Sequence, residues 1–137
     1  MIKITLDSVL FNVGEKHPVI KYLKELEKEG KVKLYSIMDI NSKEILESID
    51  LDTYDEFFDI CFPGAKRRDI SVYDHADLFL LVNHLQAERH FFLTAQKDKL
   101  VSFGKAKMLE KAGVKVRVAN ERFLKELRAA INNYDKI

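Results

Sequence analysis

Three acidic residues stand where a sheet protein carries out metal-ion chemistry. Asp7 follows the apolar run of residues 2–6, Glu44 follows the second apolar run, and Asp77 opens a third apolar segment. Clustered carboxylates from separate segments hold Mg²⁺ or Mn²⁺ through their oxygens and leave positions for water and a phosphate oxygen. The pattern therefore predicts metal-assisted phosphodiester hydrolysis. Without a cation such carboxylates repel one another, so at least one should have a raised pKa.

The segments around these acids alternate between strand and helix patterns. Strands are expected at residues 2–6, 32–37, 91–94 and 114–118, where branched and aromatic apolar side chains gather. Helices are expected at residues 18–29, 42–49, 51–62, 73–87, 99–112 and from 121 onward, because of their helical apolar spacing or their cap residues.

This order of elements predicts an α/β fold. Helix–glycine–strand junctions at Gly30 and Gly113 are typical of αβ units. Strands that alternate with helices form parallel sheets covered on both faces. We expect a single domain over residues 1–137, a three-layer α/β/α sandwich around a parallel sheet of four or five strands. Ligands of such sheets bind outside the carboxyl ends of the strands, where Asp7 lies.

Composition bounds the class of protein. The chain has 137 residues, 47% of them hydrophobic, which suffices for one domain with its own core. The formal net charge of +1 predicts no general attraction to polyanions, although a local basic patch can still bind one. The single cysteine, Cys61, excludes a disulfide framework within the chain and is expected to be a buried apolar side chain.

No signal peptide or transmembrane run is present, so a cytoplasmic location without membrane association is expected.

Each of the three acids also has a structural interpretation. Asp7 can cap a turn or a helix, and Glu44 can complete a capping box with Asn41. Asp77 can be a first-turn carboxylate that favours the helix dipole. The chemical interpretation gains weight only if all three side chains converge.

Four short motifs resemble the PIN-domain family of small metal-dependent ribonucleases, which includes many toxins of toxin–antitoxin pairs. The motifs are residues 6–10, 42–46, 77–81 and 92–98, followed by the strand–helix pair of residues 114–124. Their order and spacing span almost the whole chain. The resemblance implies a five-stranded parallel sandwich, a Mg²⁺ or Mn²⁺ site held by Asp7, Glu44 and Asp77, and the hydroxyl of Thr94 nearby.

The chain departs from the family pattern at Gln96, where the family usually has an aspartate. An amide oxygen can still face a cation, but one negative charge is lost, so weaker metal binding and weaker activity are expected. Whether Glu44 or Asp39 supplies the second acid is left open by the sequence. Further candidates at the same edge are Ser8, Asp74, Thr94 and Asp98.

Two basic segments are candidates for contacts with RNA phosphates. They are the run Lys66, Arg67 and Arg68 in a loop, and Lys97 with Lys99 after the third strand. Phosphate contacts of this kind make binding sensitive to salt. The structural interpretation of both segments is a solvated surface.

Two functions follow from the pattern and the resemblance. The first is a Mg²⁺- or Mn²⁺-dependent ribonuclease, weakened by Gln96, in which metal-activated water attacks the phosphorus. The second is a non-catalytic PIN-like module that binds RNA or protein, and Gln96 favours it. The family also implies an antitoxin or a processing complex as protein partner, and a homodimer. A phosphoacceptor signalling domain is disfavoured, because Asp7 stands alone and the strand 114–118 is followed by Ala119 and Asn120 rather than lysine.

Overall fold

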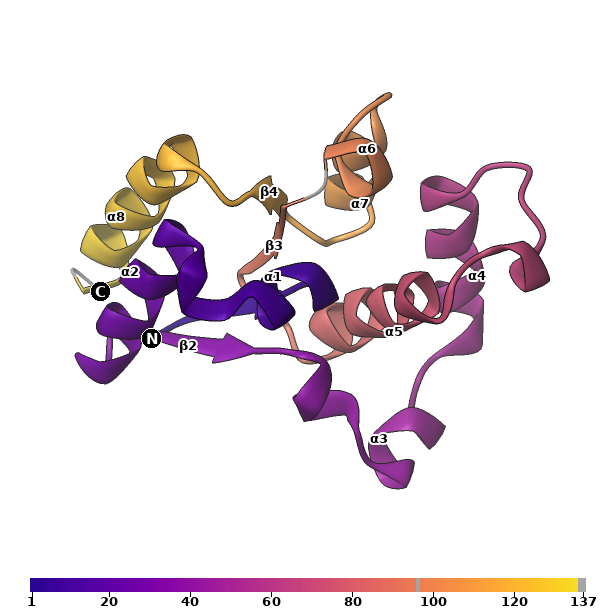
Figure 1. The fold of residues 1–137 in the computed structure, drawn as a ribbon, viewed down its shortest axis with the longest axis horizontal. Coiled ribbons are helices and arrows are strands. Elements are labelled where there is room, and N and C mark those ends of the chain that lie inside the picture. Colours follow the sequence, from indigo (N-terminus) through magenta and orange to yellow (C-terminus); the bar gives the residue numbers. More distant parts are fainter. Residues whose placement is uncertain (96, 136–137) are drawn as a thin grey trace.

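The chain folds around one parallel sheet (Figure 1). A computed structural model describes residues 1–95 and 97–135, except for the side chains of residues 97, 98 and 135. The strands are β1 (Ile2–Leu6), β2 (Val32–Tyr35), β3 (Phe91–Thr94) and β4 (Val116–Val118), in the spatial order β2-β1-β3-β4. The predicted α/β class is confirmed, and the described residues form four strands rather than five.

The order of the strands creates a switch point between β1 and β3. The chain passes from β1 to β2 on one side, then returns to place β3 on the other side of β1. In the register, Ile4 lies opposite both Leu34 of β2 and Phe91 of β3. The amide of Asp7 donates to the carbonyl of Leu93 at 3.0 Å, which extends this ladder one residue beyond β1. Open α/β sheets bind their ligands at such a point, outside the carboxyl ends of the strands.

One face of the sheet is covered by α2 (Pro18–Lys28) and α8 (Glu121–Asp135). Side chains alternate along a strand, so Ile2, Ile4 and Leu6 of β1 all point to this face. They form a continuous apolar core with helix residues that include Ile20, Leu23, Phe123 and Leu127. The same alternation turns Thr5 and Asp7 to the opposite face.

The opposite face is covered by α5 (Val72–Gln86) and α7 (Lys105–Lys111), and α4 (Leu51–Cys61) packs against both of these helices. The central helix is α5, whose residues Leu78, Leu80, Leu81 and Val82 are all buried, as the apolar run predicts. Polar contact between the layers comes from Thr5 and His84, whose Oγ1 and Nδ1 atoms share a buried hydrogen bond of 2.8 Å. This packing fixes the rotation of α5 against β1.

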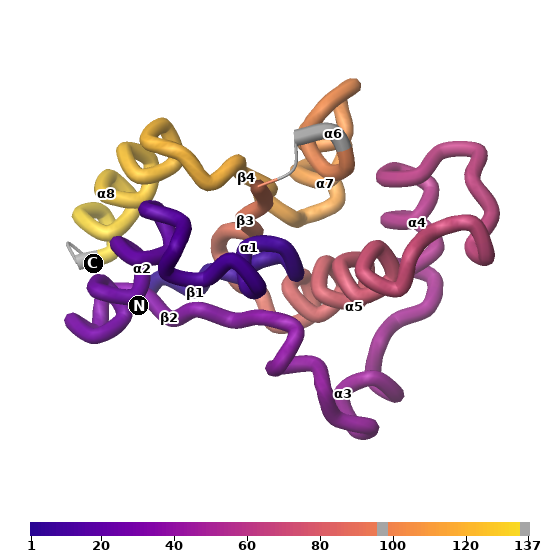
Figure 2. Tube along the Cα trace, in the orientation of Figure 1, coloured from indigo at the N-terminus to yellow at the C-terminus, as the bar shows by residue number. Residues whose placement is uncertain are grey.

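The remaining elements are short. They are α1 (Ser8–Val13), α3 (Lys43–Glu47), α6 (Lys97–Leu100) and 3₁₀ turns at Gly14–Lys16, Ile37–Ile40 and Arg67–Asp69. Figure 2 shows that the chain between β2 and α4 leaves the sheet and passes through α3 well away from the strands. No helix in the described ranges is long and apolar enough to cross a membrane.

Several predicted boundaries are corrected. The strand expected at 32–37 ends at Tyr35, because Ser36 caps a 3₁₀ turn and accepts from the Met38 amide. The helix expected at 99–112 is divided into α6 and α7, because Phe103 and Gly104 adopt positive φ angles of 59° and 79°. The strand expected at 114–118 begins at Val116, and α1, for which no helix was expected, follows Asp7 directly.

Cys61 is buried, as expected. Burial raises the pKa of its thiol to about 12, so the nucleophilic thiolate is scarce near neutral pH.

Candidate functional site

Asp7 lies at the switch point of the sheet, and its side chain is only 1% exposed. Its Oδ2 atom accepts a hydrogen bond of 2.6 Å from the Thr94 hydroxyl at the end of β3. Its Oδ1 atom accepts from the Leu10 amide at 2.8 Å, so Asp7 is also the N-cap of α1. The structural and chemical interpretations of Asp7 are therefore compatible, because the cap fixes a carboxylate that faces α5.

Asp77 approaches the same point from α5. Its Oδ1 atom accepts a hydrogen bond of 2.9 Å from the Ser8 amide, the residue after Asp7. Because α5 begins at Val72, Asp77 lies in the second helical turn, and the first-turn interpretation of this residue is wrong. The carboxylate is 8% exposed and is held against the tip of β1 by tertiary structure. Ser8 thus contributes its amide to the site.

Asp74 and Lys99 complete the group. Asp74 lies one turn before Asp77 on the same side of α5, while Ser71, rather than Asp74, caps the helix. The Lys99 ammonium of α6 donates to Asp74 Oδ1 at 2.7 Å. The Asp74 side chain is 12% exposed and that of Lys99 is 42% exposed. The ion pair therefore spans from the interior to the surface.

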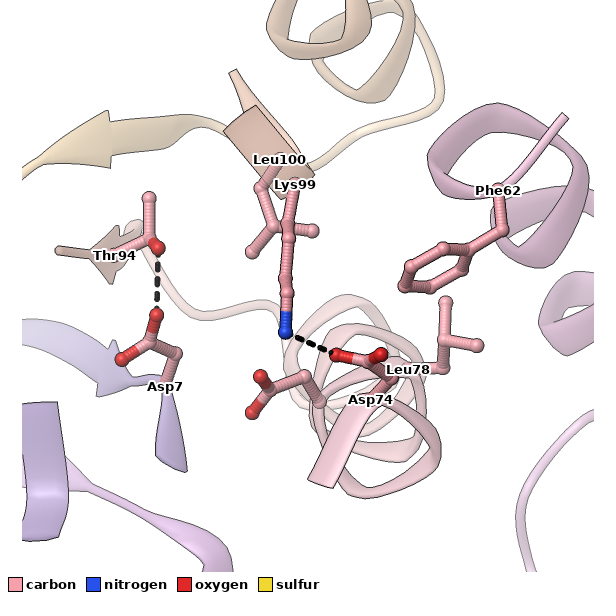
Figure 3. Close-up of a pocket in the computed structure, with 8 residues that line it drawn as sticks. Asp7, Phe62, Asp74, Leu78, Thr94, Lys99 and Leu100 are labelled. Carbon is pink, nitrogen blue, oxygen red and sulfur yellow. Dashed lines mark hydrogen bonds and ion pairs between the residues drawn. The ribbon is translucent and has the colours of Figure 1, made fainter. Parts of the chain in front are cut away.

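These side chains line a narrow pocket (Figure 3). The lining consists of Asp7, Phe62, Asp74, Asp77, Leu78, Thr94, Lys99 and Leu100. The space inside that accepts a water-sized molecule measures about 10 Å³, enough for about one water or one small ion. We call Asp7, Asp74 and Asp77 the carboxylate cluster.

The cluster is electrostatically unfavourable in the folded chain. Burial, with smaller contributions from the charges of Asp7 and Asp74, raises the pKa of Asp77 to about 6, and hydrogen bonding from Ser8 opposes the shift. Burial also raises the pKa of Asp7, against the lowering effect of Thr94, Leu10 and the charge of Lys99. The expected raised pKa is confirmed, although burial contributes more than repulsion between the acids.

Glu44 does not join the cluster. It lies exposed on α3, whose N-cap is Ser42 rather than the expected Asn41. Leu46 of α3 borders a separate apolar pocket that includes residues 72, 75, 76 and 79 of α5. That side of α5 differs from the side that carries Asp74 and Asp77, so the structure separates Glu44 from the other two predicted acids.

Asp39, the other candidate for the second acid, is also engaged elsewhere. Its Oδ2 atom accepts from the Ser36 amide at 2.7 Å in the capping box of a 3₁₀ turn. That turn packs against α5 on the side of the apolar pocket, because Ile37 and Ile40 line it. Asp39 is therefore held within its own turn and is not among the residues that line the pocket at the switch point.

In the sequence, the basic loop of residues 66–68 comes between Phe62 and Asp74, which both line the pocket, but none of its three residues is part of the lining. Arg67 pairs with Asp55 and lies 5.2 Å from the ring centroid of Tyr54. Lys66 and Arg68 are exposed. Gln96 lies outside the described residues, and the side chains of Lys97 and Asp98 are not described.

Sequence reasoning placed Lys99 among phosphate-binding candidates and missed its pairing with an acid. No local spacing signals a contact between residues 25 positions apart. Asp74 had a sequence signal, namely its position three residues before Asp77.

The oxygen donors of the cluster are the ligand type that Mg²⁺ and Mn²⁺ prefer. Within residues 1–95 and 97–135, however, no three His, Cys, Asp or Glu side chains are arranged to hold a metal ion. The ligand chemistry fits a hard cation, and the described geometry provides two buried acids with a third tied to Lys99.

Comparison with protein-family models, with curated proteins and with solved structures gives no match.

Proposed function

We propose that this chain is a Mg²⁺- or Mn²⁺-dependent ribonuclease of PIN type, with Asp7 and Asp77 as its central acids. The observation that supports this most is their convergence at the switch point. Asp77 accepts from the amide that follows Asp7, although the two residues come from β1 and from α5. Two buried carboxylates that line one pocket at the ligand-binding edge of a sheet are costly for stability, and a bound cation offsets that cost.

Asp7 and Asp77 would hold the ion, and the surrounding groups of the chain would orient them. The Thr94 hydroxyl and the Leu10 amide fix both oxygens of Asp7, while the Ser8 amide fixes one oxygen of Asp77. Partners of this kind restrict how a carboxylate meets a metal and tune its basicity. When bound, Mg²⁺ or Mn²⁺ would polarise a phosphate and make a water more acidic.

Substrate binding would use Lys99 at the pocket and the exposed cations of the loop of residues 66–68. The Lys99 ammonium is partly exposed, and Lys66 and Arg68 lie exposed on the loop between Phe62 and Asp74. Together they would attract the phosphates of a single RNA strand, with the salt dependence that such contacts bring. Phe62 and Leu100 form the apolar part of the lining and would limit water on that side.

A second function is favoured by one specific observation, the ion pair of Lys99 with Asp74. In that pair the Lys99 ammonium already balances the charge of Asp74. A non-catalytic module that binds RNA or a protein partner would then need no metal ion in the pocket. The two functions make opposite predictions for metal binding, and an RNA-binding module would share the salt-dependent RNA binding of the ribonuclease.

The test is calorimetric titration of Mn²⁺ into wild-type protein, Asp7→Asn and Asp77→Asn, followed by RNA cleavage assays with and without Mn²⁺. Asp59→Asn is the matched control, since Asp59 is exposed and lies outside the pocket lining. The ribonuclease proposal expects saturable binding and cleavage that both pocket variants lose and the control keeps. Cleavage that persists in Asp7→Asn, or RNA binding without any metal binding, would contradict it.

A further inference from the structure

We propose that Lys99 is a built-in cation that competes with divalent metal for the carboxylate cluster and leaves Asp74 when the metal binds. This inference rests on the proposed metal site. It assigns to Lys99 a regulatory role that precedes any contact with substrate.

The first support is the position of the ammonium. Figure 3 shows the Lys99 side chain extending from α6 toward the space between Asp7 and Asp74. Its Nζ atom lies 2.7 Å from Asp74 Oδ1, and Lys99 and Asp7 line the same pocket. One ammonium therefore acts on acids from two different elements, as a metal ion in the pocket would.

The second support is the arrangement of the acids. In the described part of the chain no three potential ligands form a metal-binding group, although three carboxylates line one pocket. The carboxylate that is tied to the ammonium is Asp74, one turn from Asp77 on the same helix. Release of Asp74 from Lys99 makes available the carboxylate that a third ligand position requires.

The third support is the space and the charge. The pocket holds about 10 Å³ for a water-sized molecule, so a metal ion and a paired ammonium compete for one small volume. A divalent cation near the ammonium is also repelled by it, and burial strengthens that repulsion because screening is weaker inside the protein.

The anchoring of α6 allows this exchange without refolding. Leu100 is 4% exposed and fixes the backbone beside Lys99, while the Lys99 side chain is long and 42% exposed. The ammonium can thus move toward solvent on its flexible stem. After its displacement the Lys99 ammonium remains beside the place where a phosphate would bind. Metal binding thus releases Lys99 from Asp74 and leaves it available to the substrate.

The experiment is Mn²⁺ titration by calorimetry into wild-type protein and three variants. Lys99→Met removes the charge and keeps the apolar stem, and Lys99→Arg keeps the charge. Lys107→Met removes an equal charge from an exposed position of α7 outside the pocket. We expect Lys99→Met to bind Mn²⁺ at least tenfold more tightly than wild type, with Lys99→Arg and Lys107→Met within about twofold of wild type, by the charge argument above.

The outcomes separate this inference from the proposed function. Equal or weaker binding by Lys99→Met, with saturable binding by wild type, overturns the role of Lys99 and leaves the metal site standing. An equal gain in Lys107→Met shows a general charge effect and also overturns it. No binding by any of the four proteins overturns both. Circular dichroism melts of each variant verify that the titrated protein is folded.

Discussion

Replacement of Asp77 by asparagine should stabilise the protein at alkaline pH. The carboxylate is buried between α5 and the tip of β1, and its pKa is raised from 3.8 to about 6. A raised carboxyl pKa means that the ionised form is less favourable in the folded chain than in the unfolded chain. The contribution of Asp77 to the free energy of unfolding is therefore fully present below about pH 4, and it is lost as the pH rises through about 6.

The size of the effect follows from the shift. One pKa unit corresponds to about 1.4 kcal/mol, so ionised Asp77 costs up to about 3 kcal/mol at pH 8. Asparagine is never ionised, has almost the same shape, and keeps an oxygen that can accept from the Ser8 amide. The effect of that hydrogen bond on the ionised form is already contained in the net pKa shift, so it needs no separate correction. The expected net gain is about 3 kcal/mol at pH 8 and below about 1 kcal/mol at pH 4.

Urea unfolding of wild type and Asp77→Asn at several pH values measures this difference. The buffer must contain a chelator, because a metal that binds only the folded wild-type protein adds stability and hides the cost. Asp59→Asn serves as the control for loss of one exposed negative charge. Subtracting the unfolding free energy of wild type from that of Asp77→Asn at each pH removes the contribution of every titrating group that the substitution does not affect.

Two results would refute the reasoning. One is an Asp77→Asn variant that is less stable than wild type at pH 8, which would mean that the carboxylate stabilises the fold. The other is a gain that does not shrink between pH 8 and pH 4, since a titrating group cannot produce it. A comparable gain in Asp59→Asn would attribute the effect to net charge instead of burial.

Three further predictions concern other parts of the molecule. Thr94→Val should lower the unfolding free energy by about 1–3 kcal/mol, because buried Asp7 loses a donor, whereas Thr94→Ser should retain most of it; equal losses in urea unfolding would contradict this. Burial lowers the pKa of His84 to about 3, so neutral His84 favours folding above pH 6.5 and this contribution is lost as pH falls. Wild type should therefore lose about 2 kcal/mol between pH 7 and pH 5 through His84, and His84→Gln should lack that slope in the same assay. Glu44→Gln should leave the Mn²⁺ affinity within about twofold of wild type, and a tenfold loss in calorimetry would return Glu44 to the site.

Strong periodicity explains which elements could be predicted. The apolar residues of α2 recur at helical spacing and all face one core, and α5 is apolar on most sides because it packs between the sheet and α4. Both features depend on burial and can therefore be read from residue type. In contrast, α1 has six residues and begins at a cap that also belongs to the site, so no repeated pattern marks it.

The candidate site was predictable only in part, for a physical reason. Asp7 follows a strand and must lie at the sheet edge, and Asp77 belongs to the helix that packs across that edge. The position of Glu44 depends on the path between β2 and α4, which two short turns direct away from the sheet. The pairing of Lys99 with Asp74 depends on where α6 docks, and tertiary contact alone determines that.

The bond between Thr94 and Asp7 has a consequence for synthesis of the protein. It joins residues 87 positions apart, and β3 pairs directly with β1 in the middle of the sheet. A nascent chain that has emerged only as far as α5 already contains Asp7, Asp74 and Asp77, but it lacks the strand that holds Asp7 in place. A fragment that ends before β3 therefore lacks the donor that holds Asp7, and the pocket is completed only when β3 and α6 have also emerged and folded.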